Sequence, residues 1–169
     1  MNLRQFIRQV LLESQDEWNY SSLTPKRPKP SNKDPWKESG IRFTAVAIQD
    51  PEEIKKLESG LQHALQEHGI TIPSNWKRSH DYHMTIQLGA MQLRQRIADV
   101  GKQVKLEVHS LGVSNTNIAL GVSGYMSKKP HQHITVAFEL LPSESNEITN
   151  WMPLERSFTV TGVITEYRQ

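Results

Sequence analysis

The feature that most constrains this fold is a succession of short β-type segments over residues 41–167. Each segment is either mostly apolar or alternates apolar and polar residues, as buried and half-buried strands do. The predicted strands cover 41–48, 82–89, 104–113, 117–124, 131–140 and 157–167. Strands far outnumber helices, so the sequence predicts an α+β domain with an antiparallel or mixed sheet and a few helices outside it.

The longer of two helical stretches has a start signal and a stop signal. Asp50 is a good N-cap residue, and Pro51 suits the first turn. Gly69 follows the last apolar turn, where a C′ glycine is expected. Residues 91–101 form a second, shorter stretch that predicts a short helix or loop. The predicted core face of the longer helix consists of Ile54, Leu57, Leu61, Ala64 and Leu65.

Residues 1–40 differ in composition from the rest of the chain. They carry seven Lys and Arg against five Asp and Glu, whereas 41–169 carry thirteen of each. Four of the nine prolines lie in 24–37. We interpret 14–40 as a Pro-rich basic linker that acts as a solvated tether, with weak contact with nucleic acid as the alternative. Residues 41–169 then form the folded domain, in which the candidate functional residues described below lie.

Residues 1–13 have the pattern of a short amphipathic helix, with Leu3, Phe6, Ile7, Val10 and Leu11 on one face. A helix this short is marginal alone, so we expect it to dock on its own domain or to be a detachable leader. It resembles the N-terminal leaders of some tailed-phage proteins. Residues 11–14, Leu-Leu-Glu-Ser, resemble a site cut by phage prohead proteases.

The chain contains no cysteine. This excludes disulfides, thiolate nucleophiles and cysteine-ligated zinc. Apolar runs fall short of the roughly 18 residues that a membrane span needs, and the first residues lack the apolar centre of a secretory signal. We therefore expect a cytoplasmic protein without membrane contact, packaged in virions if the leader interpretation holds.

Two predicted strands carry the same tetrapeptide pattern. His83-Met84-Thr85-Ile86 and His133-Ile134-Thr135-Val136 each read His, apolar, Thr, apolar. Because alternate residues of a strand share a face, His and Thr point together while the apolar pair faces the core. One copy alone would be typical of an ordinary strand, since β-branched residues favour strands. Packing gives no reason to repeat the polar pair, so the duplication indicates a functional site.

Such a pair of motifs is suited to phosphodiester cleavage. One imidazole can act as general base on water or a ribose hydroxyl, and the other as general acid on the departing oxygen. We predict His83 and His133 as these groups, and the sequence leaves open which is which. The hydroxyls of Thr85 and Thr135 would bind the nonbridging phosphate oxygens. This mechanism needs neither a metal nor another cofactor.

Both motifs resemble those of the 2H phosphoesterase superfamily, over about residues 41–167. The resemblance implies a two-lobed, pseudo-symmetric fold whose sheets form a central cleft. It also implies a monomeric hydrolase of 2′,3′-cyclic phosphates on RNA ends or nucleotides, or of cyclic nucleotides. The two motifs are only fifty residues apart. This spacing resembles the compact RNA-repair and phage members, and implies loss of a helix between 117–124 and 128–136.

Other residues near the motifs are weaker candidates. Lys128 and Lys129 precede the second motif and would offer charge to phosphates, or lie at a solvated hairpin tip. The aromatic residues Trp76, Tyr82 and Trp151 would stack a base or, more simply, pack in the core. Residues 145–146, Ser-Asn, are typical of a helix N-cap or a turn rather than of a ligand.

Two other functional classes remain as alternatives. His80, His83, His131 and His133 form two small clusters, and the His-x-His pair could chelate a metal in a cupin-like enzyme. That interpretation gives no role to the repeated threonine. A noncatalytic RNA-binding module is the other alternative, and its function would survive the loss of both motif histidines.

Overall fold

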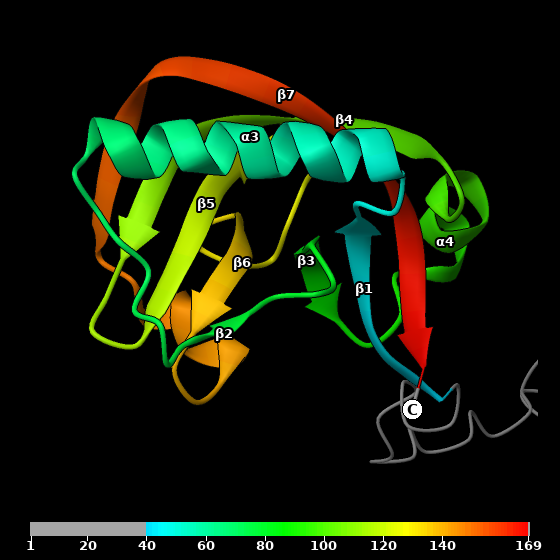
Figure 1. Cartoon of the computed structure of the whole chain (residues 1–169). Coiled ribbons are helices and arrows are strands. Elements are labelled where there is room, and N and C mark those ends of the chain that lie inside the picture. Colours follow the sequence, from blue (N-terminus) through cyan, green and yellow to red (C-terminus); the bar gives the residue numbers. More distant parts are fainter. Residues whose placement is uncertain (1–39, 169) are drawn as a thin grey trace, which may run out of the picture. The chain divides into compact units, whose positions relative to one another are not determined.

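The computed structural model describes residues 40–168. The predicted helix over 1–13 and almost all of the predicted linker over 14–40 lie outside the described residues. In chain order the elements are β1 (Ile41–Ala47), α3 (Pro51–Glu67), β2 (Lys77–Arg78), β3 (His83–Leu88), α4 (Leu93–Asp99), β4 (Gln103–Val113), β5 (Asn117–Ser123), β6 (His133–Phe138), the 3-10 helix η1 (Pro142–Glu147) and β7 (Asn150–Arg168) (Figure 1).

Six strands close into one antiparallel β-barrel. Their order around the ring is β6, β3, β1, β7, β4 and β5, and β5 pairs with β6 to close it. The two-residue strand β2 is the extra strand, which pairs with the end of β6 opposite Ala137 and Phe138. The 19-residue strand β7 pairs with both β1 and β4, and Figure 1 shows it arching from one side of the molecule to the other. These pairings make one continuous sheet.

The predicted two-lobed, pseudo-symmetric fold is therefore wrong. Two lobes around a central cleft would need separate sheets, but β5 pairs with β6 over Asn117–Gly121. On the other side of the ring, β7 joins β1 to β4 without a break between sheets. The chain between β5 and β6, where the resemblance implied a lost helix, is an irregular connection over residues 124–132.

Local patterns predicted the individual elements well. Every predicted strand overlaps an observed one, and the predicted short helix or loop over 91–101 contains α4. The side chain of Asp50 caps α3 by accepting a hydrogen bond from the backbone N–H of Glu52 at 2.8 Å. After α3, Gly69 has a φ of 64°, a left-handed conformation that favours glycine. The largest difference is β7, which begins at Asn150 rather than near residue 157.

The barrel interior and one face of α3 share a single core. The buried face of α3 consists of Leu57, Leu61, Ala64 and Leu65. These side chains join one apolar cluster with buried residues of the six barrel strands. Figure 1 shows α3 lying across the strands. A helix of this length has little stability alone in water, so burial of this apolar face supplies most of its stability.

None of the helices within residues 40–168 is long and apolar enough to cross a membrane.

Candidate active site

The two His-x-Thr motifs lie on neighbouring antiparallel strands, β3 and β6. Met84 pairs with Ile134, which sets the register between the two strands. The apolar members of both motifs, Met84, Ile86, Ile134 and Val136, are at most 2% exposed. Strand alternation therefore places the four His and Thr side chains on the opposite, outer face, where all four are half-buried. The predicted orientation of the motifs is confirmed.

Both motifs open onto one hollow of about 480 Å³. His83, Thr85, His133 and Thr135 all line it. Its walls come from the start of β1, from residues 78–81, from β3 and β6, and from η1. The fold thus brings all four predicted site residues together, although the two motifs are fifty residues apart in the chain.

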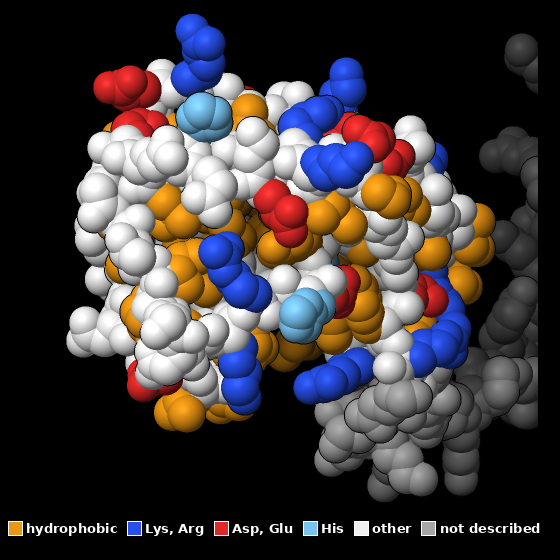
Figure 2. Space-filling view, in the orientation of Figure 1, with side chains coloured by type: hydrophobic (Ala, Val, Ile, Leu, Met, Phe, Trp, Pro, Cys, Tyr) orange, Lys and Arg blue, Asp and Glu red, His pale blue; other side chains and the backbone are white. Residues whose placement is uncertain are grey.

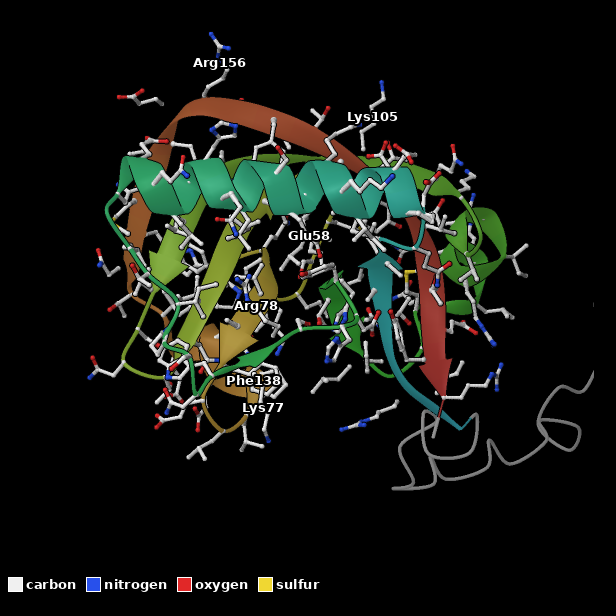
Figure 3. The ribbon with its side chains drawn as sticks, in the orientation of Figure 1. Glu58, Lys77, Arg78, Lys105, Phe138 and Arg156 are labelled. Atoms are coloured by element: carbon white, nitrogen blue, oxygen red, sulfur yellow. The ribbon has the colours of Figure 1, made fainter. Side chains whose placement is uncertain are left out.

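The hollow carries more positive than negative charge in its walls. Arg42, Arg78 and Lys129 line it, against the single carboxylate of Asp81. Figure 2 shows Lys and Arg side chains around a histidine in the lower half of the face in view. Figure 3 shows Arg78 in front of β6, with Lys77 and Phe138 at the lower end of that strand. This charge favours an anionic ligand.

Each motif histidine is oriented by the carbonyl group two residues before it. Nδ1 of His83 lies 3.1 Å from the carbonyl oxygen of Asp81, and Nδ1 of His133 lies 2.8 Å from that of His131. A carbonyl oxygen only accepts hydrogen bonds, so Nδ1 carries the proton in both rings. Nε2 is then the basic nitrogen of each neutral imidazole. The two histidines therefore have the same tautomer.

On the His83 side, the contacts are aromatic and acidic. Oδ2 of Asp81 lies 3.3 Å from Nδ1 of His83, and Oδ1 accepts a hydrogen bond from the Tyr167 hydroxyl at 3.0 Å. The Tyr167 ring stacks on Phe43 with centroids 4.3 Å apart. Burial, together with the Asp81 carboxylate, raises the pKa of Tyr167 well above its usual value. Tyr167 therefore stays a neutral donor to Asp81.

On the His133 side, the contacts are hydroxyl groups and a cation. The Ser145 hydroxyl lies 3.0 Å from Nε2 of His133 and 2.7 Å from the Thr135 hydroxyl, and donates to the Pro142 carbonyl at 2.6 Å. Burial lowers the pKa of His133, and the charge of Lys129 lowers it further, against the opposing hydrogen bond to the His131 carbonyl. His133 is thus favoured in its neutral form.

Sequence reasoning missed Arg42, Arg78 and Tyr167, and it also missed the site roles of Ser145 and Asp81. Ser145 was expected in a turn, and it does lie in the 3-10 turn η1, but its side chain is 2% exposed and contacts His133. No local pattern connects it to a histidine twelve residues earlier. Asp81 had a usable signal, because it precedes His83 by only two residues, in the bend that leads into β3.

Of the weaker candidates, some line the hollow and others do not. Lys129 lines the hollow, whereas the residues found around the hollow do not include Lys128. None of the three predicted stacking aromatics lines it either. Tyr82 is 6% exposed in the core, and Trp76 packs against that core. Trp151 packs over Gly112 and Gly121, with its ring centroid 6.1 Å from that of His133.

The clustered histidines of the metal alternative are only partly brought together. His80, His83 and His133 line the hollow, while the His131 ring lies against Trp151 at 5.9 Å. Within residues 40–168, no three His, Asp or Glu side chains are grouped so that they could hold a metal ion.

No protein-family model matches this chain, and a search of curated proteins finds no match.

Proposed function

We propose that this protein is a metal-independent phosphodiesterase, which hydrolyses 2′,3′-cyclic phosphates of nucleotides or RNA ends, or cyclic nucleotides. The observation that carries the proposal is the convergence of His83, Thr85, His133 and Thr135 on one hollow. Two imidazoles of the same tautomer, each oriented through Nδ1, are the groups that general acid–base cleavage requires. We extend the 2H phosphoesterase resemblance to this chemistry, and not to the two-lobed fold.

Charge and size support an anionic substrate of nucleotide dimensions. The hollow of about 480 Å³ falls within the usual range for small-molecule sites. Arg42, Arg78 and Lys129 would attract the phosphate and stabilise its charge. Within the described residues the Thr85 hydroxyl forms no hydrogen bond, so it is free to donate to a nonbridging oxygen. The Thr135 hydroxyl is held by Ser145 at 2.7 Å.

The test is a hydrolysis screen with the full chain. The substrates are 2′,3′-cyclic mononucleotides, RNA with a 2′,3′-cyclic phosphate end, and cyclic dinucleotides, each with and without EDTA. We expect hydrolysis of at least one class, no effect of EDTA, and a loss of about 10²-fold or more in His83→Ala and in His133→Ala. Each Thr→Ala variant loses less.

A matched control is His109→Ala, because His109 is an exposed strand histidine that does not line the hollow. This variant keeps full activity. Loss of activity on chelation would favour the cupin-like alternative. RNA binding that survives both motif substitutions, with no hydrolysis of any substrate, would favour the noncatalytic module.

A further inference from the structure

The two motif histidines differ in what lies beside them. The imidazole of His83 has a carboxylate oxygen of Asp81 3.3 Å from Nδ1. The imidazole of His133 has the Ser145 hydroxyl at Nε2 and a carbonyl at Nδ1, and the charge of Lys129 acts on it. The same pair of motifs is therefore embedded in two electrostatically opposite surroundings.

Asp81 is held in place although its side chain is half exposed. Its second oxygen accepts a hydrogen bond from Tyr167, which reaches it from the end of β7. The Tyr167 and Phe43 rings lie 5.4 Å and 5.2 Å from the His83 ring. These contacts fix the carboxylate beside the imidazole rather than leaving it free in water.

The charges around the two rings favour different protonation states. A carboxylate within about 4 Å favours a charged imidazole, whereas burial and a neighbouring cation favour the neutral ring. The latter effects lower the pKa of His133. The two histidines face one another. The other titratable or charged groups that face them are Asp81, Tyr167, Arg42, Arg78, His80, Lys129 and His131.

We propose that Asp81, clamped by Tyr167, is a positioning residue that keeps His83 protonated, so that His83 is the general acid and His133 the general base. This assignment rests on the phosphodiesterase function proposed above. It follows the rule that neighbouring titratable groups in opposite environments divide the acid and base roles between them.

In this assignment each histidine transfers one proton during hydrolysis. Nε2 of neutral His133 takes a proton from water, and the water oxygen forms a bond to phosphorus. The bond from phosphorus to one ribose oxygen breaks, and Nε2–H of His83 donates its proton to that oxygen. The product is a phosphate monoester, and proton exchange with solvent restores both rings. The Ser145 hydroxyl keeps its bond to the Pro142 carbonyl and accepts from His133 once Nε2 is protonated.

The experiment compares leaving groups that do and do not need an acid. The substrates are a nucleoside 2′,3′-cyclic phosphate and its two analogues with sulfur at the 2′ or 3′ bridging position, because a thiolate departs without protonation. On the oxygen substrate, we expect His83→Ala to lose at least about 10²-fold and Asp81→Asn about tenfold. On the sulfur analogue that is cleaved, the losses of activity in His83→Ala and Asp81→Asn shrink to about twofold. The loss in His133→Ala is the same on the oxygen and the sulfur substrate.

Variants and a second readout separate positioning from folding. Tyr167→Phe gives a smaller loss with the same dependence on the leaving group. Asp99→Asn is the matched control, because it removes a carboxylate that accepts from Tyr125 at 2.6 Å and does not line the hollow. We expect Asp99→Asn to hydrolyse both the oxygen and the sulfur substrate at the wild-type rate. The NMR chemical shifts of the His83 ring nitrogens, measured at one fixed pH in the full chain, move toward those of a neutral imidazole in Asp81→Asn, and not in Asp99→Asn.

Several results would overturn the assignment. If His133→Ala lost much less activity on the sulfur analogue than on the oxygen substrate, His133 would be the general acid and His83 the general base. Equal losses of Asp81→Asn on oxygen and sulfur would give Asp81 a purely structural role. Unchanged ring-nitrogen chemical shifts of His83 in this variant would remove the coupling. If the wild-type protein hydrolyses none of these substrates, the acid role falls with the proposed function, while the NMR chemical shifts of the His83 ring still decide the coupling between Asp81 and His83.

Discussion

The hydroxyl of Ser145 lies between the two polar groups of the second motif. It contacts Nε2 of His133 and the Thr135 hydroxyl, and it donates to the Pro142 carbonyl. At 2% exposure, these contacts are shielded from water. A buried polar group stripped of its partner loses the hydrogen bond and stays desolvated. Removing Ser145 therefore deprives the Thr135 hydroxyl and the Pro142 carbonyl of this partner.

We predict that Ser145→Ala lowers the free energy of unfolding by about 1–2 kcal/mol, because the Thr135 hydroxyl and the Pro142 carbonyl lose a hydrogen-bond partner. It also reduces kcat by about tenfold, since the His133 ring loses its contact at Nε2. Urea denaturation and steady-state kinetics measure the two effects. The matched control is Ser143→Ala, an exposed serine of the same 3-10 helix, which leaves stability unchanged. Equal stability of the two variants would contradict the role of the Ser145 contacts.

At the residue scale, the sequence predicted which strand face the motif side chains occupy, but it did not predict their hydrogen-bond partners. Period-two alternation is local, so it placed His83, Thr85, His133 and Thr135 correctly on the outer face. The hydrogen bonds of Ser145 and of Asp81 to Tyr167 depend on how distant segments pack. Asp81 and Tyr167 are 86 residues apart, and no spacing rule connects them.

Helix α3 contains a glycine that its packing requires. A Cβ at Gly60 would overlap the ring of Phe158 on β7. Helix α3 is also tied to β7 through Glu53, which accepts a hydrogen bond from the Thr161 N–H at 2.7 Å. Helix propensity alone would favour alanine at this position by about 1 kcal/mol. The close approach of helix and strand reverses that preference.

We therefore predict that Gly60→Ala destabilises the protein by about 1–2 kcal/mol, because overpacking costs more than the gain in propensity. The control is Ser59→Ala, at the preceding exposed position, which raises stability by about 0.5 kcal/mol. Adding Phe158→Leu to Gly60→Ala makes room for the methyl group, so the double variant loses less than the sum of the single losses. Chemical denaturation is measured for the wild-type protein and for all four variants, Phe158→Leu included. A gain of stability in Gly60→Ala would contradict the close contact.

At the element scale, α3 and β7 show where prediction works and where it does not. The cap at Asp50, the apolar face and Gly69 are local signals, and all three mark α3 correctly. The first part of β7 has no such signal, because it contains Pro153 and the adjacent charges Glu155 and Arg156. Its pairing with β4 determines the strand there, from Asn150 opposite Val113.

Ring closure is the property of the whole molecule that the sequence did not reveal. Each strand was predictable, but the pairings of β7 with both β1 and β4, and of β3 with β6, join segments far apart in the chain. The predicted two-lobed arrangement would divide these strands between separate sheets. The closed barrel nevertheless places β3 beside β6, so both arrangements bring the two motifs together.

Burial of His133 in the folded protein gives a pH dependence of stability. Its pKa is lowered on folding, so the unfolded chain binds more protons below pH 6.5. The free energy of unfolding therefore falls as the pH falls from about 6.5 through the folded pKa of His133. Urea denaturation between pH 7 and pH 5 shows a smaller decrease for His133→Gln than for the wild-type protein. His109→Gln keeps the wild-type slope, and an unchanged slope in His133→Gln would contradict this linkage.

The central claim is that His83 and His133 act together on one phosphodiester, and a double-mutant cycle tests it most directly. The measurement is kcat/KM for a 2′,3′-cyclic nucleotide with the wild-type protein, His83→Ala, His133→Ala and the double variant. Groups that act as one unit show strongly non-additive losses. We predict a loss of about 10²-fold or more for each single variant and hardly any further loss in the double variant. Single variants that retain wild-type activity, or a double loss equal to the product of the single losses, would contradict the account.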